Sequence, residues 1–119
     1  MEIHCDGSGW NGERSRICLV TCPNGIEDVK ITDLPIEFTN NEAEYLAMIW
    51  ALQVATDRDI IYSDSQLVIN QINGSYKIKQ QHLKYFAARC QMILLKKKIK
   101  IIWIPREKNK AGLVFDKGG

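Results

Sequence analysis

The order of strand-like and helix-like segments is the feature that most restricts the fold of this 119-residue chain. Strand patterns come first, at residues 2–6, 14–21 and 26–34, with a tight turn at 23–25. A helix follows from Asn40 or Asn41, either of which is a suitable N-cap, to about Thr56. The rest predicts a strand at 60–62, helices at 65–72 and 83–94, a strand at 98–104 and a short tail helix. A hairpin followed by strand–helix units predicts an α/β fold with one five-stranded mixed sheet flanked by helices.

Length and composition predict one domain, residues 1–119, with a single core. The net charge is only +2, but lysines crowd the later part of the chain, which fits a surface that faces phosphates. The sequence contains no apolar run long enough for a membrane span and no signal peptide, so we expect a cytoplasmic protein. The spacing of Cys18 and Cys22 along one strand is too long for a disulfide, so we expect reduced cysteines.

Acidic residues stand in three separate settings along the chain. Asp6 and Asp64 each follow a short apolar run that predicts a strand, and Glu44 lies in the first turns of the predicted helix. The carboxyl ends of neighbouring strands meet at one edge of an α/β sheet, where functional groups collect. Clustered carboxylates repel one another unless a cation lies between them, and hard oxygen ligands favour Mg²⁺ or Mn²⁺. We therefore expect Asp6, Glu44 and Asp64 to form a metal site.

The surroundings of these acids resemble the type 1 ribonuclease H family. The matching motifs are Asp6-Gly7-Ser8, then Thr39-Asn40-Asn41 followed three residues on by Glu44, then Asp64-Ser65-Gln66. Each motif alone is common, but their joint order and spacing are specific, and the resemblance covers nearly the whole chain. It implies a monomeric endonuclease that hydrolyses the RNA strand of RNA/DNA hybrids, with two Mg²⁺ or Mn²⁺ ions when substrate is bound.

The resemblance also implies roles for neutral residues. Thr39 is expected in a pocket for a DNA-strand phosphate, Asn41 and Gln66 in the minor groove of the hybrid, and Gly7 and Ser65 beside the RNA strand. Contact with 2′-hydroxyl groups near the site is how such a fold distinguishes RNA from DNA.

The sequence departs from the family in two places. The basic protrusion of some members is missing, and we expect lysines to replace its phosphate contacts: Lys77, Lys79 and Lys84. The family motif Asn-x-x-Ala-Asp would supply a fourth acid, but this chain has Asn109-Lys110-Ala111-Gly112-Leu113. The candidates for the fourth catalytic position are Asn109, through its amide oxygen, and Asp116, and we favour Asn109. If neither residue is a ligand, the three carboxylates alone would be sufficient for catalysis.

Two alternatives to a ribonuclease H remain, the first because the fourth acid is missing and the second because integrases and resolvases share this order of elements. One is a catalytically weak module that binds hybrids, and the other is a related nuclease that cuts different nucleic acids. The complete set of three acids argues against the first alternative. Thr-Asn-Asn together with Asp-Ser-Gln argues against the second.

Overall fold

The computed structural model describes residues 1–117 and contains one five-stranded mixed sheet. The strands are β1 (Glu2–Ser8), β2 (Ser15–Thr21), β3 (Asp28–Leu34), β4 (Ile60–Ser63) and β5 (Lys100–Trp103). The helices are α1 (Asn40–Val54), α2 (Gln66–Ile72), α3 (Gln81–Lys96) and α4 (Lys110–Lys117), with short 3-10 turns η1 (Pro23–Gly25) and η2 (Arg106–Lys108). The predicted order of elements and the fold class are confirmed.

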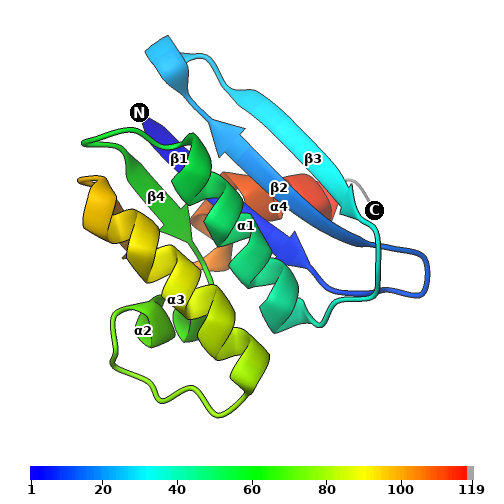
Figure 1. Cartoon of the computed structure of the whole chain (residues 1–119). Coiled ribbons are helices and arrows are strands. Elements are labelled where there is room, and N and C mark those ends of the chain that lie inside the picture. The colour runs from blue at the N-terminus through cyan, green and yellow to red at the C-terminus, as the bar shows by residue number, and fades with distance from the viewer. Residues whose placement is uncertain (118–119) are drawn as a thin grey trace.

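The sheet has the order β3-β2-β1-β4-β5, and β1 lies at its centre. β1 pairs antiparallel with β2 and parallel with β4, and β4 pairs parallel with β5. Figure 1 shows α1 and α3 in front of the sheet and α4 behind it. The main core lies between the sheet and the helices α1, α2 and α3, and a smaller cluster under α4 includes Cys18, Val20 and Ala111. The parallel β1–β4 pair brings the ends of both strands to one edge of the sheet.

The first strand is longer than the sequence predicted. The predicted strand ended at Asp6, but β1 continues through Gly7 and Ser8, which pair with Ile17 and Arg16 of β2. The reason is close packing: a Cβ added to Gly7 would lie 2.2 Å from the carbonyl carbon of Ala43 in α1. The glycine in this strand therefore marks a close approach of helix backbone to strand backbone rather than the end of the strand.

The cap of α1 is Thr39, and not Asn40 or Asn41 as expected. The Thr39 side chain accepts a hydrogen bond from the amide of Glu42, and the Glu42 side chain accepts one from the amide of Thr39, which forms a capping box. Asn40 instead accepts a hydrogen bond from the Gly9 amide. This bond ties the start of α1 to the loop that follows β1.

Lys97 belongs to the lysine-rich later part of the chain, which was expected to face phosphates, but it makes contacts within the protein. Its Nζ donates to the carbonyl oxygens of Leu52, Gln53 and Ala55, at distances of 2.8–3.1 Å. These carbonyls lie at the C-terminal end of α1, where a cation also interacts favourably with the helix dipole. Lys97 therefore joins the end of α3 to the end of α1.

All four cysteines lie in the described part of the chain and are unpaired, as expected. Within residues 1–117, no helix has both the length and the apolar character needed to cross a bilayer.

Candidate metal centre

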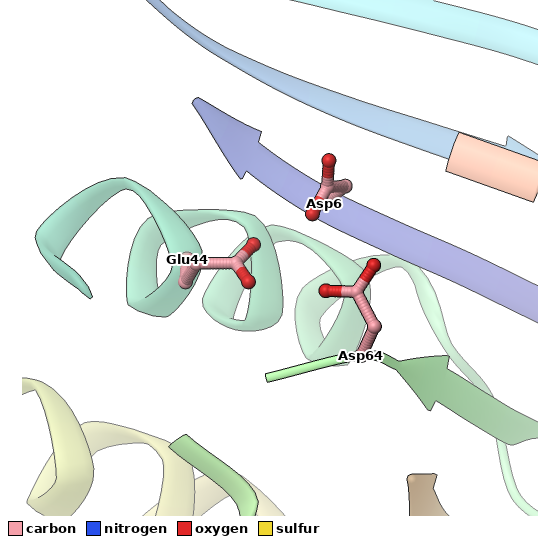
Figure 2. Close-up of side chains that lie close together, drawn as sticks. All are labelled: Asp6, Glu44 and Asp64. Atoms are coloured by element: carbon pink, nitrogen blue, oxygen red, sulfur yellow. The ribbon is translucent and has the colours of Figure 1, made fainter. Parts of the chain in front are cut away.

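Three carboxylates from three different elements converge at the edge of the sheet. Asp6 comes from β1, Glu44 from α1, and Asp64 from the residue that follows β4, and Figure 2 shows their carboxyl groups pointing toward one another. One oxygen of each lies within 4.8 Å of those of the other two. Asp6 is only 1% exposed and Glu44 8%, so two of the three carboxyl groups are almost completely removed from bulk water. The predicted convergence is confirmed by this geometry.

Gly7 is the residue that lets Glu44 reach the site. Because Gly7 has no side chain, α1 packs directly on β1, and the amide of Gly7 donates a 2.6 Å hydrogen bond to Oε1 of Glu44. Gly7 is buried, so its position is one of internal packing. The sequence associated Gly7 with the RNA strand, whereas its observed contacts are with α1 and with the carboxylate itself.

Electrostatics in the metal-free site favour the protonated form of Glu44. Burial, and then the charge of nearby Asp6, raises the pKa of Glu44 to about 9. Burial also raises the pKa of Asp6, but its contacts with Glu44 and with Arg106 oppose the change. A proton shared by the pair therefore resides on Glu44, and binding of a cation would release it.

The residues present fit a hard divalent cation. Oδ1 of Asp6 is fully buried and has no hydrogen-bond partner among residues 1–117. A buried oxygen without a partner carries a large desolvation cost, which a cation would remove. The remaining donors are carboxylate oxygens, the ligand type that Mg²⁺ and Mn²⁺ prefer.

Arg106 contributes to this site, and the sequence analysis did not include it. Its Nη1 donates to Oδ2 of Asp6 at 2.7 Å and to Oδ2 of Asp64 at 3.2 Å. Its Nη2 donates to Oδ1 of Asp116 at 3.0 Å. The local sequence carries no signal for these contacts, because Arg106 lies 100 residues from Asp6 and 42 from Asp64 along the chain.

Asn109 lies at the site, but its amide oxygen does not face the carboxylates. Its Nδ2 donates to the carbonyl of Cys5 at 3.1 Å and to Oδ2 of Asp64 at 3.2 Å, and its Oδ1 accepts from the amide of Ala111. Asn109 is 0% exposed, so these bonds fix its orientation. The amide oxygen of Asn109 was expected to be a metal ligand, but it accepts from the Ala111 amide instead. The amide nitrogen of Asn109 positions the carboxylate of Asp64.

Asp116 reaches the metal centre only through Arg106. It is exposed on the last turn of α4 and pairs with the guanidinium rather than with the three carboxylates. On the side of α4 that faces the site, Gly112 is buried, and a Cβ added there would lie 2.9 Å from Cζ of Arg106. The arginine therefore fills the space beside Gly112.

The predicted substrate residues fall into two groups. Thr39, Asn41 and Gln66 are exposed near the carboxylates at the starts of α1 and α2, in positions open to a ligand. Ser65 is buried and caps α2, because its Oγ accepts from the amide of Val68. A cleft of about 420 Å³ lies beside Thr39 and is lined in part by Trp10.

The lysines expected to replace the basic protrusion are exposed. Lys77 and Lys79 lie in the loop between α2 and α3, and Lys84 lies near the start of α3. Figure 1 shows this loop at the end of the molecule toward which β1 and β4 point. His82 Nε2 lies 3.7 Å from Glu42 Oε2, which places the start of α3 beside the start of α1. All three lysines are therefore on the same end of the molecule as the carboxylates.

Comparisons with known proteins agree with this fold. Residues 13–114 match the model of the family described as reverse transcriptase-like. The structure is similar to RNase H1 from the halophilic archaeon Halobacterium salinarum NRC-1, with 25% identity, a TM-score of 0.82, and coverage of 92% of this chain and 89% of that chain. It is also similar to LC11-RNase H1 in complex with an RNA/DNA hybrid, with 30% identity, a TM-score of 0.75, and coverage of 92% and 88%.

A second structure of LC11-RNase H1, isolated from compost by a metagenomic approach, is 30% identical, with a TM-score of 0.79 and coverage of 98% of this chain and 96% of that chain. The family model covers Glu44 and Asp64, and it begins after Asp6. The chain therefore belongs to the reverse transcriptase-like family and, within it, to the type 1 ribonuclease H proteins.

Proposed function

We propose that this chain is a metal-dependent endonuclease that hydrolyses the RNA strand of RNA/DNA hybrids. The observation that carries the proposal is the convergence of Asp6, Glu44 and Asp64 with oxygens within 4.8 Å of one another. Membership of the family supports it, as does the likeness to a solved ribonuclease H1 that is bound to such a hybrid.

Asp6, Glu44 and Asp64 would hold Mg²⁺ or Mn²⁺, with the free Oδ1 of Asp6 as one ligand. When bound, such ions activate a water molecule and stabilise the leaving oxygen in phosphodiester hydrolysis. The Gly7 amide fixes Glu44, and the amide group of Asn109 fixes Asp64. These contacts orient the carboxylates before any ion or substrate arrives, which lowers the cost of assembling the site.

Substrate binding is assigned to the exposed groups around the carboxylates. Thr39, with its neighbouring cleft, would take a phosphate of the DNA strand, and Asn41 and Gln66 would contact the minor groove. Ser65 would act mainly through the cap of α2, beside the RNA strand. Lys77, Lys79 and Lys84 would neutralise phosphates further along the hybrid. All these groups come from one chain, so we propose that residues 1–119 form a single catalytic domain that acts as a monomer.

A catalytically weak hybrid-binding module is the second candidate. The observation that favours it is the guanidinium of Arg106, which already pairs with Asp6 and Asp64, in a site that lacks a fourth acid. Such a protein would bind RNA/DNA hybrids in preference to other nucleic acids and would not cut them.

The experiment that tests the proposal uses one labelled RNA strand in three forms: paired with DNA, paired with RNA, and single. Labelled double-stranded DNA is included, and each substrate is incubated with Mg²⁺, with Mn²⁺ and with chelator. The proposal predicts metal-dependent cleavage of the RNA strand in the hybrid alone. Binding without cleavage in either metal would favour the module, and cleavage of duplex DNA would identify a different nuclease.

A further inference from the structure

Among residues 1–117, Arg106 is the cationic side chain that contacts the acidic residues of the metal centre. The same Nη1 atom lies 2.7 Å from Asp6 and 3.2 Å from Asp64, so one guanidinium nitrogen bridges two of the three carboxylates. The oxygens that it contacts are Oδ2 of each aspartate, whereas Oδ1 of Asp6 is left without a partner among the described residues. The site thus has one set of oxygens already paired with a cation and one buried oxygen that is free.

The surrounding structure holds the guanidinium in this position. Asp116 accepts from its second nitrogen at 3.0 Å, so the arginine is anchored on the side away from the metal centre. Gly112 leaves the space that the arginine fills, since even a Cβ at that position would lie 2.9–3.0 Å from guanidinium atoms. Gly112 and Asp116 of α4 therefore fix the position of the Arg106 guanidinium, which comes from η2.

A guanidinium and a divalent cation cannot share the same carboxylate oxygens without strong repulsion. Both charges would lie within a few ångströms of each other in a partly buried site, where screening by water is reduced. Arginine remains protonated at all pH values at which proteins are studied, so it cannot leave the site by losing its charge. A cation that uses Oδ2 of Asp6 or of Asp64 therefore competes with the side chain of Arg106.

We propose that Arg106 is a built-in competitor of divalent cations, and that it restricts the substrate-free protein to one ion. This inference rests on the proposed metal site. The buried Oδ1 of Asp6 and the carboxylate of Glu44 would hold this ion, and the oxygens paired with Arg106 would be closed to a second ion. Asp116 acts as a positioning residue that holds the arginine in the competing position.

The test is calorimetric titration of the full chain with MnCl₂ alone, without nucleic acid, so that the readout does not depend on activity. The proteins are the wild type, Arg106→Gln, Arg106→Lys and Asp116→Asn. The matched control is Arg14→Gln, since Arg14 is a half-exposed arginine whose ion pair with Asp33, at 3.9 Å, lies outside the site. Folding of each variant is checked by circular dichroism.

The proposal predicts that Arg106→Gln binds Mn²⁺ about tenfold more tightly than the wild type or binds a second ion. Arg106→Lys keeps the charge, so its affinity for Mn²⁺ should be closer to that of the wild type. The affinity of Arg14→Gln for Mn²⁺ should equal that of the wild type. Equal affinity and stoichiometry for the wild type and a folded Arg106→Gln would overturn the proposal. If Arg106→Gln does not fold, Asp116→Asn decides: an increase in affinity of about threefold supports the competition, and no change overturns it.

Failure of the proposed function gives a different result. If neither the wild type nor any folded variant binds Mn²⁺, the three carboxylates do not form a metal site, and the competition falls with it. If all proteins bind Mn²⁺ equally, the metal site stands and only the role of Arg106 is rejected.

Discussion

The buried carboxyl group of Glu44 makes the stability of the metal-free protein depend on pH, and Glu44→Gln should remove that dependence. Burial and the charge of Asp6 raise the pKa of Glu44 to about 9 in the folded protein. In an unfolded chain the pKa of a glutamate is about 4.3. Between these values the folded protein holds a proton that the unfolded chain has released. The free energy of unfolding therefore falls as the pH rises through this window.

The size of this change in the free energy of unfolding follows from the uptake of one proton by Glu44 in the folded protein. Each pH unit inside the window changes the free energy of unfolding by about 1.4 kcal/mol. From pH 6 to pH 8 the wild type should therefore lose about 2.7 kcal/mol relative to Glu44→Gln, whose amide does not titrate. Both pH values lie between the pKa of Glu44 in the unfolded chain and its pKa of about 9 in the folded protein.

The assay is urea unfolding at pH 6, 7 and 8 in the presence of a chelator. Glu107→Gln serves as the control, because Glu107 is an exposed glutamate on η2 with no contact to the three carboxylates, and it should follow the wild type. Saturating Mg²⁺ should reduce the decline in the wild type, since the ion favours the ionised carboxylate. Parallel pH profiles for the wild type and Glu44→Gln would refute the assignment of the proton to Glu44.

The remaining predictions concern substrate contacts, positioning and packing. Glutamine substitutions at Lys77, Lys79 and Lys84 should lower the log–log salt slope of hybrid binding by about 0.7 to 0.9 for each phosphate contact that is removed. An unchanged slope would mean that these lysines face solvent and contact no phosphate. Asn109→Ala should impair hydrolysis and lower the free energy of unfolding by about 1–3 kcal/mol, because the Cys5 carbonyl loses its buried donor. Asp116→Ala should have a smaller effect on both quantities. A larger effect of Asp116→Ala in kinetic and unfolding measurements would refute the positioning role of Asn109. Gly7→Ala should destabilise the fold by about 3 kcal/mol or more, since its Cβ would collide with the backbone of α1, and thermal unfolding near that of the wild type would contradict this packing.

The parts of the site that depend on local pattern could be predicted from sequence. Short apolar runs placed Asp6 and Asp64 at neighbouring strands, and helical periodicity placed Glu44 in the first turns of α1, which together predicted the convergence of the three acids. The order of strands and helices predicted the five-stranded sheet because few topologies are compatible with it.

Features that depend on contacts between distant segments were missed or wrong. Gly7 and Ser8 carry a turn-like local sequence, yet β1 continues through them because α1 packs on the backbone of Gly7. The choice of Thr39 over the neighbouring asparagines as the cap was settled by the reciprocal bond with Glu42. Arg106 could not be assigned at all, since its partners are brought to it only by the complete fold.

Hydrolysis of a labelled RNA/DNA hybrid by the wild type and by Asp64→Asn, measured side by side, tests the central claim most directly. The substitution keeps the size of the side chain and removes one carboxylate from the metal centre. The account predicts that the wild type cuts the RNA strand only when Mg²⁺ or Mn²⁺ is present, and that Asp64→Asn, with an unchanged circular dichroism spectrum, does not cut it in either metal. Retention of most of the activity by Asp64→Asn, or equal cleavage by the wild type in chelator, would contradict a metal centre built from these three acids.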